Sequence, residues 1–120
     1  MKLRIRDHSI RLRLTQTEVK NLIKKGSINS ETSFPNKATF KYELSLGDSF
    51  NASFEATGII VTIPADKAND WSRSEELSIE AFIENGEEKS LRLLIEKDLT
   101  CATDRPYEDD SDAFPNEDGC

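Results

Sequence analysis

The sequence predicts an α+β fold, a duplicated strand–helix–strands unit that forms a mainly antiparallel sheet of about eight strands with two helices. Apolar and polar residues alternate with a period of two along most of residues 1–97, which is typical of strands with one buried face. Two stretches with helical spacing interrupt this alternation, one between Thr15 and Gly26 and one that begins at Pro64. Because eight strands can close on themselves, we expect a strongly curved or barrel-like sheet, with an open sheet as the alternative.

The first two strands are predicted over 2–6 and 9–14. In both strands apolar residues alternate with basic ones, as Leu3 and Ile5 do in the first. The segment Asp7-His8-Ser9 between them has the composition of a tight turn.

The first helix is predicted to follow the second strand. Thr15-Gln-Thr-Glu18 has the pattern of a capping box, in which a threonine hydroxyl and a glutamate satisfy exposed amides at the helix start. Apolar residues with helical spacing follow: Val19, Leu22 and Ile23. Gly26 is a typical residue at which to end the helix.

The later elements are predicted from the same patterns. Further strands are expected near 27–34, 38–46, 50–56, 59–63, 76–84 and 89–97. Pro64 suits the first position of the second helix, whose inner face carries Ala68 and Trp71. Asn85-Gly86 predicts a hairpin between the last two strands.

The two halves of residues 1–97 match at nearly constant offsets. Three apolar positions recur 49 residues later, since Ile10, Leu12 and Leu14 fall on Ile59, Val61 and Ile63. Beyond the next hairpin the offset is 51, with Phe40 on Leu91 and Leu44 on Ile95. We interpret this as an internal duplication, about 1–46 and 50–97, within one domain.

Residues 98–120 form a separate acidic tail. Residues 1–97 carry 15 basic and 15 acidic residues, whereas the tail has eight acidic residues and one base, so it supplies the whole net charge of −7. The tail is expected either to be a disordered solubilising segment or to be anchored to the domain by its aromatic residues, Tyr107 and Phe114. Cys101 and Cys120 also lie here, as free thiols or as a reversible pair.

Four arginines on the first two predicted strands are the leading candidate site: Arg4, Arg6, Arg11 and Arg13. If these strands pair as a hairpin, the four side chains share one face with neighbours ~5 Å apart. Such a cluster needs carboxylates or a polyanion beside it, and the arginine fork suits phosphate. The predictions are therefore an anion or nucleotide site, a solvated face paired with carboxylates (Glu43, Glu80 or Glu96), or a face covered by the acidic tail.

The remaining residues do not form a catalytic or cofactor motif. A single histidine, His8, and two distant cysteines fall short of a zinc site, and the acidic tail lacks EF-hand spacing, so the metal question stays open. The acidic net charge argues against nucleic acid, and no apolar run reaches the ~18–20 residues of a membrane span. The basic start of the chain is unlike a signal peptide, so a cytoplasmic location is expected.

Two resemblances add to this interpretation. The opening Met-Lys-Leu-Arg-Ile-Arg, the run Ser9-Ile-Arg-Leu-Arg-Leu-Thr-Gln-Thr-Glu-Val19 and the ending Glu96-Lys-Asp-Leu-Thr-Cys101 with Asp112-Ala-Phe-Pro-Asn116 resemble an uncharacterised family of small bacterial proteins. The duplicated unit resembles, at the level of fold, the CYTH or triphosphate-tunnel architecture, which implies a charged interior that binds phosphates with a divalent metal. Those enzymes carry Glu-x-Glu-x-Lys on the first strand, where this chain reads Lys2-Leu-Arg-Ile-Arg6.

We therefore predict a non-enzymatic binding or interaction module without a cofactor, whose partner is a protein or a small anionic ligand. The alternative is a tunnel-like phosphate- or nucleotide-binding protein that uses the basic strand face as an anion clamp. The sequence leaves the oligomeric state undefined.

Overall fold

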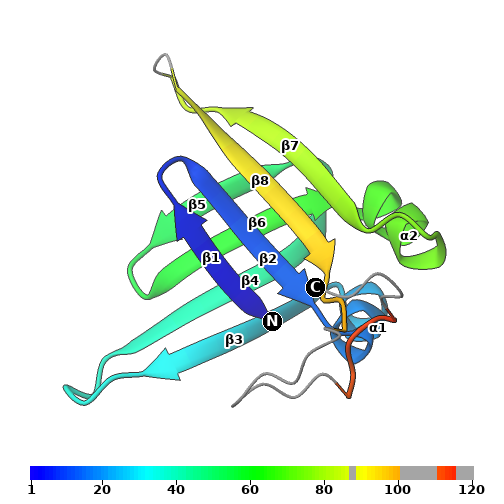
Figure 1. The fold of residues 1–120 in the computed structure, drawn as a ribbon. Helices are drawn as coiled ribbons and strands as arrows, with labels where there is room; N and C mark the ends of the chain where they lie inside the picture. Colours follow the sequence, from blue (N-terminus) through cyan, green and yellow to red (C-terminus); the bar gives the residue numbers. More distant parts are fainter. Residues whose placement is uncertain (87–88, 101–110, 116–120) are drawn as a thin grey trace. The chain divides into compact units, whose positions relative to one another are not determined.

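The computed structural model describes residues 1–86, 89–100 and 111–115, and its elements follow the order strand–strand–helix–strand–strand twice (Figure 1). The first set is β1 (Lys2–Arg6), β2 (Ser9–Leu14), α1 (Gln16–Lys25), β3 (Ser27–Ser33) and β4 (Thr39–Gly47). The second set is β5 (Asn51–Glu55), β6 (Gly58–Pro64), α2 (Ala65–Arg73), β7 (Ser78–Glu84) and β8 (Ser90–Lys97). These bounds agree closely with the strands and helices predicted from the alternation of apolar and polar residues.

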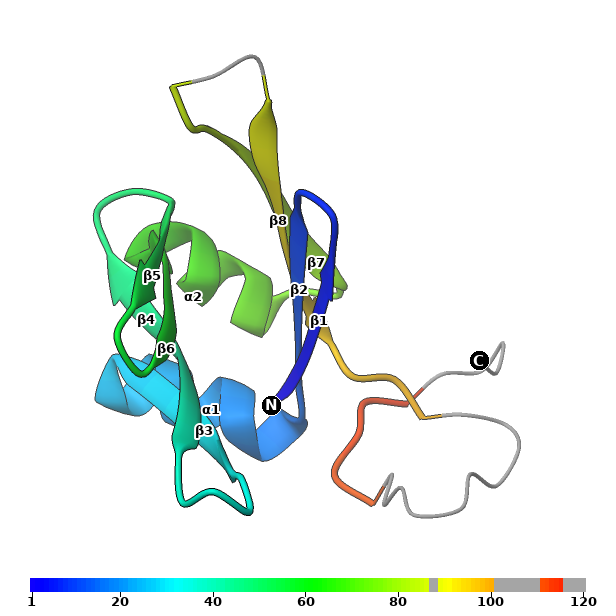
Figure 2. The ribbon, with the colours of Figure 1, turned by 90° about the vertical axis from the view of Figure 1, so that its left-hand side faces the viewer.

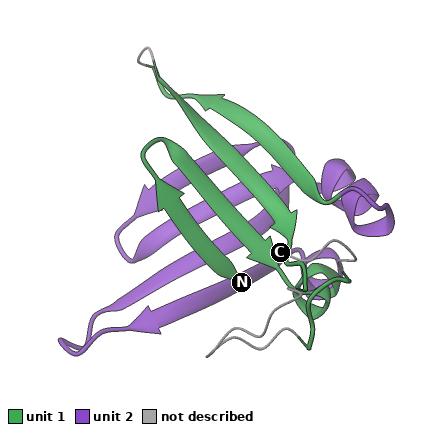
Figure 3. Cartoon of the chain, in the orientation of Figure 1, with its two compact units in different colours: residues 1–20, 77–120 green, residues 21–76 purple. Residues whose placement is uncertain are grey.

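The chain divides into two compact units, shown in different colours in Figure 3. Unit 1 consists of Met1–Lys20 and Leu77–Cys120, and unit 2 of Asn21–Glu76. Each unit contains one four-stranded sheet, and α1 spans the boundary between the two segments of chain. The sheet of unit 1 contains the hairpins β1–β2 and β7–β8, and the sheet of unit 2 contains β3–β4 and β5–β6. Each sheet therefore takes one hairpin from each half of the sequence.

Eight strands and two helices are present in the described residues, as predicted, but the strands do not form one barrel-like sheet. The strands form two sheets, with the order β1-β2-β8-β7 in unit 1 and β3-β4-β6-β5 in unit 2. Hairpins are antiparallel, but the central pairs β2–β8 and β4–β6 are parallel, so both sheets are mixed. Each helix joins a strand of one sheet to a strand of the other, since α1 lies between β2 and β3 and α2 between β6 and β7. Each sheet is then completed by a pairing between strands far apart in the sequence, which local patterns do not encode.

The unit 1 sheet is built on the parallel pairing of β2 with β8. Ile10 lies opposite Leu93 and Leu12 opposite Ile95, while β1 and β7 form the two edges. Both views of the ribbon show β7 and β8 continuing beyond the turn between β1 and β2 (Figures 1 and 2). The sheet therefore narrows to two strands at that end.

The unit 2 sheet has an equivalent register. Tyr42 lies opposite Ile59 and Leu44 opposite Val61. Adding 51 to the β4 number and subtracting 49 from the β6 number converts these pairs into the β8–β2 pairs of unit 1. The two sheets thus share a register, whereas the common origin of the two halves stays a prediction.

Each unit buries apolar side chains from its strands and adjoining segments. In unit 1 the buried apolar residues are Ile10, Leu12, Leu14, Val19, Leu93, Ile95 and Ala113. In unit 2 they are Leu22, Leu44, Ile59, Val61, Ile63, Ala68 and Trp71. In unit 2, α2 packs against β4 and β6, which accounts for the burial of its inner face as predicted. Neither helix of the described chain has the length and apolar character of a membrane span.

The two helices begin differently. At α1 the Glu18 amide donates to the Thr15 hydroxyl (3.3 Å) and the Thr15 amide donates to the Glu18 carboxylate (3.0 Å), which confirms the capping box. At α2, Pro64 occupies the N-cap with no side-chain cap and an extended ψ of 133°. It still pairs with Gly47 as the last residue of β6, so the helix begins one residue later than predicted.

Candidate functional site

A tight hairpin brings the four predicted arginines together. Asp7 adopts a left-handed conformation (φ 50°) between β1 and β2, and the Ser9 hydroxyl donates to the Arg6 carbonyl at 2.7 Å. The Arg92 amide donates to the His8 carbonyl at 2.8 Å, which ties the turn to β8. His8 itself is an exposed turn residue, as expected.

The strand register places these arginines on one face of the unit 1 sheet, in rows that cross all four strands. The first row is Arg6, Ser9, Arg92 and Phe82, the second is Arg4, Arg11, Leu94 and Glu80, and the third is Lys2, Arg13, Glu96 and Ser78. We call this surface the polar face of unit 1. Residues of alternate register, such as Leu12 and Leu93, point to the opposite, buried side.

Two of the four arginines share one carboxylate. Glu96 on β8 lies 2.5 Å from Nε of Arg11 and 2.6 Å from Nε of Arg13, and these three side chains are only partly exposed. One negative charge therefore serves two positive charges. The prediction of pairing with Glu96 holds for this half of the cluster.

The other two arginines, Arg4 and Arg6 on β1, are not paired with Glu96. Within residues 1–86, 89–100 and 111–115, the guanidinium groups of Arg4 and Arg6 make no ion pair or hydrogen bond, and both residues are exposed. Glu80 pairs instead with Arg92, at 2.7 Å from Nε and 2.5 Å from Nη2. Glu43 belongs to the sheet of unit 2.

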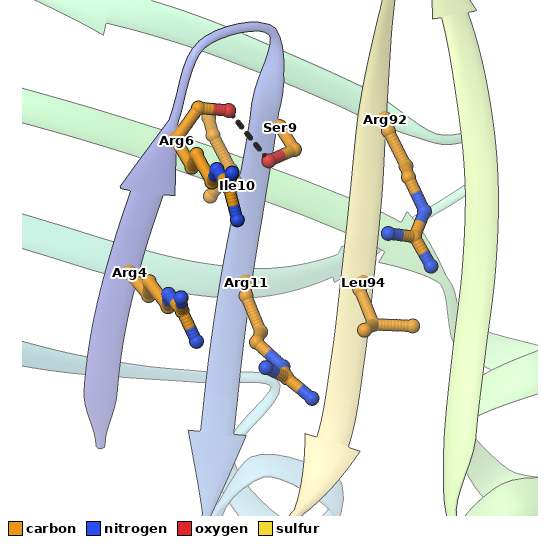
Figure 4. A pocket seen from close by; sticks show the side chains of 7 residues that line it. All are labelled: Arg4, Arg6, Ser9, Ile10, Arg11, Arg92 and Leu94. Carbon is orange, nitrogen blue, oxygen red and sulfur yellow. Dashed lines mark hydrogen bonds between the residues drawn. The ribbon is translucent and has the colours of Figure 1, made fainter.

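A hollow of about 220 Å³ opens among these side chains. Its lining is shown in Figure 4 and consists of Arg4, Arg6, Ser9, Ile10, Arg11, Arg92 and Leu94. Figure 4 shows Arg4 and Arg6 reaching from β1 towards β2, and Arg11 reaching towards β8. Among the residues that the structure describes, the lining thus contains four guanidinium groups and no carboxylate.

The charge of this lining is only partly compensated among the described residues, because Arg11 pairs with Glu96 and Arg92 with Glu80, whereas Arg4 and Arg6 have no such carboxylate there. Guanidinium groups keep their charge at physiological pH. Directly opposed residues such as Arg4 and Arg11 have Cβ atoms ~5 Å apart, so their charges repel. An anion in the hollow would remove that repulsion and accept several charge-assisted hydrogen bonds at once.

A second hollow lies in the unit 2 sheet. It measures about 270 Å³. Its lining mixes charges of both signs and consists of Asn29, Lys41, Glu43, Glu55, Thr57, Gly58, Ile59 and Ile60. The two hollows occupy corresponding registers of their sheets. In the hollow of unit 1 every charged residue of the described lining is basic, whereas the hollow of unit 2 has both signs.

Residues 111–115 of the tail belong to unit 1. Phe114 forms a parallel bridge with Leu99, exchanging backbone hydrogen bonds of 2.7 Å with Thr100 and Asp98. The Lys97 ammonium lies 5.4 Å from the centre of the Phe114 ring. The structure therefore places Phe114, one of the two predicted anchors, against the end of β8. Tyr107, the other predicted anchor, and both cysteines lie outside the described residues.

The same segment contacts the start of α1. The Thr17 amide donates to the Asp112 carboxylate at 3.2 Å, and the Gln16 amide donates to the Asp112 carbonyl at 2.9 Å. Hydrogen bonds from the side chains of Thr15 and Thr17 lower the pKa of Asp112 below its ordinary value of 3.8. Among the described residues, no three His, Cys, Asp or Glu side chains gather closely enough to hold a metal ion.

Sequence reasoning located the arginines of β1 and β2 and the outward direction of Arg92, but it did not place Ser9, Arg92 and Phe82 in one row with Arg6. Ser9, Arg92 and Phe82 reach it through the pairings β2–β8 and β7–β8. The alternation within residues 89–97 indicates that Arg92 points away from the core. Nothing local indicates which strand lies beside it.

The sequence profile of a family of unknown function (DUF7009) matches residues 1–118. The chain belongs to this family. The predicted resemblance to an uncharacterised family is confirmed at that level, while the bacterial origin, the cytoplasmic location and the triphosphate-tunnel resemblance stay predictions. No curated protein and no solved structure matches the chain.

Proposed function

We propose that this protein is a non-enzymatic binding module that takes a multiply charged phosphate anion on the polar face of unit 1. The observation that carries the proposal is the basic hollow, whose described lining has four arginines and no carboxylate. Arginine donates two parallel hydrogen bonds to phosphate oxygens, so several guanidinium groups can hold one polyphosphate.

The distribution of ion pairs supports this proposal. Glu96 and Glu80 hold Arg11, Arg13 and Arg92 in place, whereas Arg4 and Arg6 keep their donors available. Pre-positioned arginines lower the entropy cost of binding, and available ones supply new contacts. The lining offers positive charge and hydrogen-bond donors but no side chain that titrates near neutral pH, so its chemistry favours binding over proton transfer.

Calorimetric titration with inorganic tripolyphosphate tests the proposal. We expect the double variant Arg4→Ala/Arg6→Ala to bind about 100-fold more weakly, because each charge-assisted contact contributes about 1.5 kcal/mol or more. The affinity of the native protein for tripolyphosphate should fall as the salt concentration is raised, because Arg4 and Arg6 are exposed to solvent and their charges are screened.

A charge-matched variant provides the control. Lys24→Ala/Lys25→Ala also removes two positive charges, but from the last turn of α1, and should leave the affinity for tripolyphosphate unchanged. An equal loss in both variants would show that only net charge matters, and the proposed site would be wrong. Equally tight binding of a short polyglutamate peptide would instead indicate a protein partner for this face.

A further inference from the structure

An exposed aromatic residue lies in line with the basic hollow. The first row of the polar face runs from Arg6 on β1 through Ser9 and Arg92 to Phe82 on β7. Directly paired residues project to the same side of a sheet, so Phe82 shares the face of the arginines.

The Phe82 ring is unusually accessible for its type. It is 62% exposed, whereas the neighbouring residues Ala81 and Ile83 are partly buried on the other side of β7. Its neighbour across the strands, Arg92, is held by Glu80 through hydrogen bonds of 2.5 and 2.7 Å. A flat apolar surface is thus presented beside a set of phosphate-binding groups.

We propose that the anion bound here is a nucleoside polyphosphate, with its base stacked on Phe82 and its phosphates among Arg4, Arg6 and Arg11. This inference rests on the proposed anion-binding function and names the class of ligand. Three strand spacings separate the two ends of the row, roughly 14 Å. That span matches an extended nucleoside triphosphate from its base to its terminal phosphate.

The arrangement of charge favours a free nucleotide over a nucleic acid strand. Arg4 and Arg6, which have no ion pair among the described residues, both lie on the edge strand β1, where a triphosphate would place three or more negative charges close together. A single strand distributes one phosphate to each nucleotide and usually meets a basic groove with several aromatic platforms. The described part of this face offers one exposed aromatic residue, Phe82.

Titrations of the whole chain with adenosine triphosphate and with tripolyphosphate test the inference. We expect adenosine triphosphate to bind about tenfold more tightly than tripolyphosphate, as base stacking on an aromatic side chain usually contributes. Phe82→Ala should remove that tenfold advantage and leave the affinity for tripolyphosphate unchanged. Phe82→Trp should preserve it.

Phe54→Ala is the matched control. Phe54 is a still more exposed aromatic residue, 84% accessible, on the edge strand β5 of unit 2. Its removal should change neither affinity. Thermal unfolding of each variant should confirm that it remains folded, as expected for substitutions at exposed side chains.

The outcomes separate this inference from the function on which it rests. If tripolyphosphate binds but adenosine triphosphate gains nothing, or if Phe82→Ala leaves that gain intact, the nucleotide inference is wrong and the anion site stands. If tripolyphosphate does not bind, both are wrong. Tighter binding of a short single-stranded oligonucleotide than of adenosine triphosphate would overturn the assignment to a free nucleotide.

Discussion

The hollows on the two sheets lie at the same strand register but differ in charge. With the offsets of 49 and 51, Arg6 of unit 1 corresponds to Glu55 of unit 2, and Leu94 corresponds to Glu43. The first hollow is lined by four arginines, whereas the second combines one lysine with two glutamates. The comparison teaches that sheet topology provides the position of a site, while the side chains decide what it can bind.

The two sheets also differ at one position of equivalent register, where the backbone of unit 2 adopts a positive φ of 157°. Gly58, the first residue of β6, lies opposite Lys41, and a Cβ added there would lie 1.6 Å from the Lys41 carbonyl oxygen. Ser9 is its counterpart in β2, opposite Arg92, and carries a side chain without difficulty. The same register therefore tolerates a side chain in one unit and excludes it in the other.

The largest expected effect comes from this pair of positions. Gly58→Ala should destabilise the protein by about 3 kcal/mol, because backbone must move to relieve the clash. Ser9→Ala should cost only about 0.5 kcal/mol, since it loses one exposed hydrogen bond. Urea unfolding of both variants measures the difference, and similar losses would show that the backbone conformation at this register does not distinguish the two sheets.

A smaller effect is expected at the next corresponding pair, Glu96 and Ser45. Glu96→Gln leaves Arg11 and Arg13 without their carboxylate and should lower stability by about 1 kcal/mol, less so at high salt. The same change should raise the affinity for tripolyphosphate several-fold, because removing the negative charge that competes for Arg11 outweighs the loss of its positioning.

Ser45→Ala tests the counterpart position of unit 2. It removes the 3.1 Å contact between the Ser45 and Thr62 hydroxyl groups and should leave anion affinity unchanged. If Glu96→Gln weakened tripolyphosphate binding, Glu96 would be needed to orient the arginines and would not be a competitor of the ligand.

The smallest expected effect on stability concerns the two helix starts. The Asp112 carboxylate accepts a hydrogen bond from the Thr17 amide at the start of α1, whereas no side-chain hydrogen bond caps α2. The pKa of Asp112 is lowered by hydrogen bonds from Thr15 and Thr17, so its contribution to stability is present above pH 3.8 and is lost as the pH falls through the lowered pKa. Asp112→Asn should therefore be less stable than the native protein at pH 7, and the difference should shrink at lower pH.

Thermal unfolding at a series of pH values measures that difference. Asp48→Asn, which removes a carboxylate from an exposed turn of unit 2, is the charge-matched control. A gap between native protein and Asp112→Asn that stays constant down to the most acidic pH would contradict an ionised contact between the tail and α1.

Much of the local structure could be predicted from single residues and their spacing. The alternation of Leu12 and Leu14 with arginines defined β2, and Thr15 with Glu18 defined the start of α1. These patterns work because backbone geometry alone places alternate strand residues on opposite sides and leaves the first helix amides without partners. The start of α2 was predicted one residue too early, at Pro64, because Pro64 pairs with Gly47 and so belongs to β6.

The sequence by itself determined the strands, the helices, the shared face of the arginines and the excess of acid in the tail. Only the tertiary structure decided that eight strands divide into two mixed sheets, that Glu96 serves two arginines, and that Arg92 and Phe82 join the same row. The physical reason is that local patterns depend on neighbours within a few residues. Pairing such as that of Arg11 with Glu96 joins residues 85 positions apart and depends on how whole strands pack.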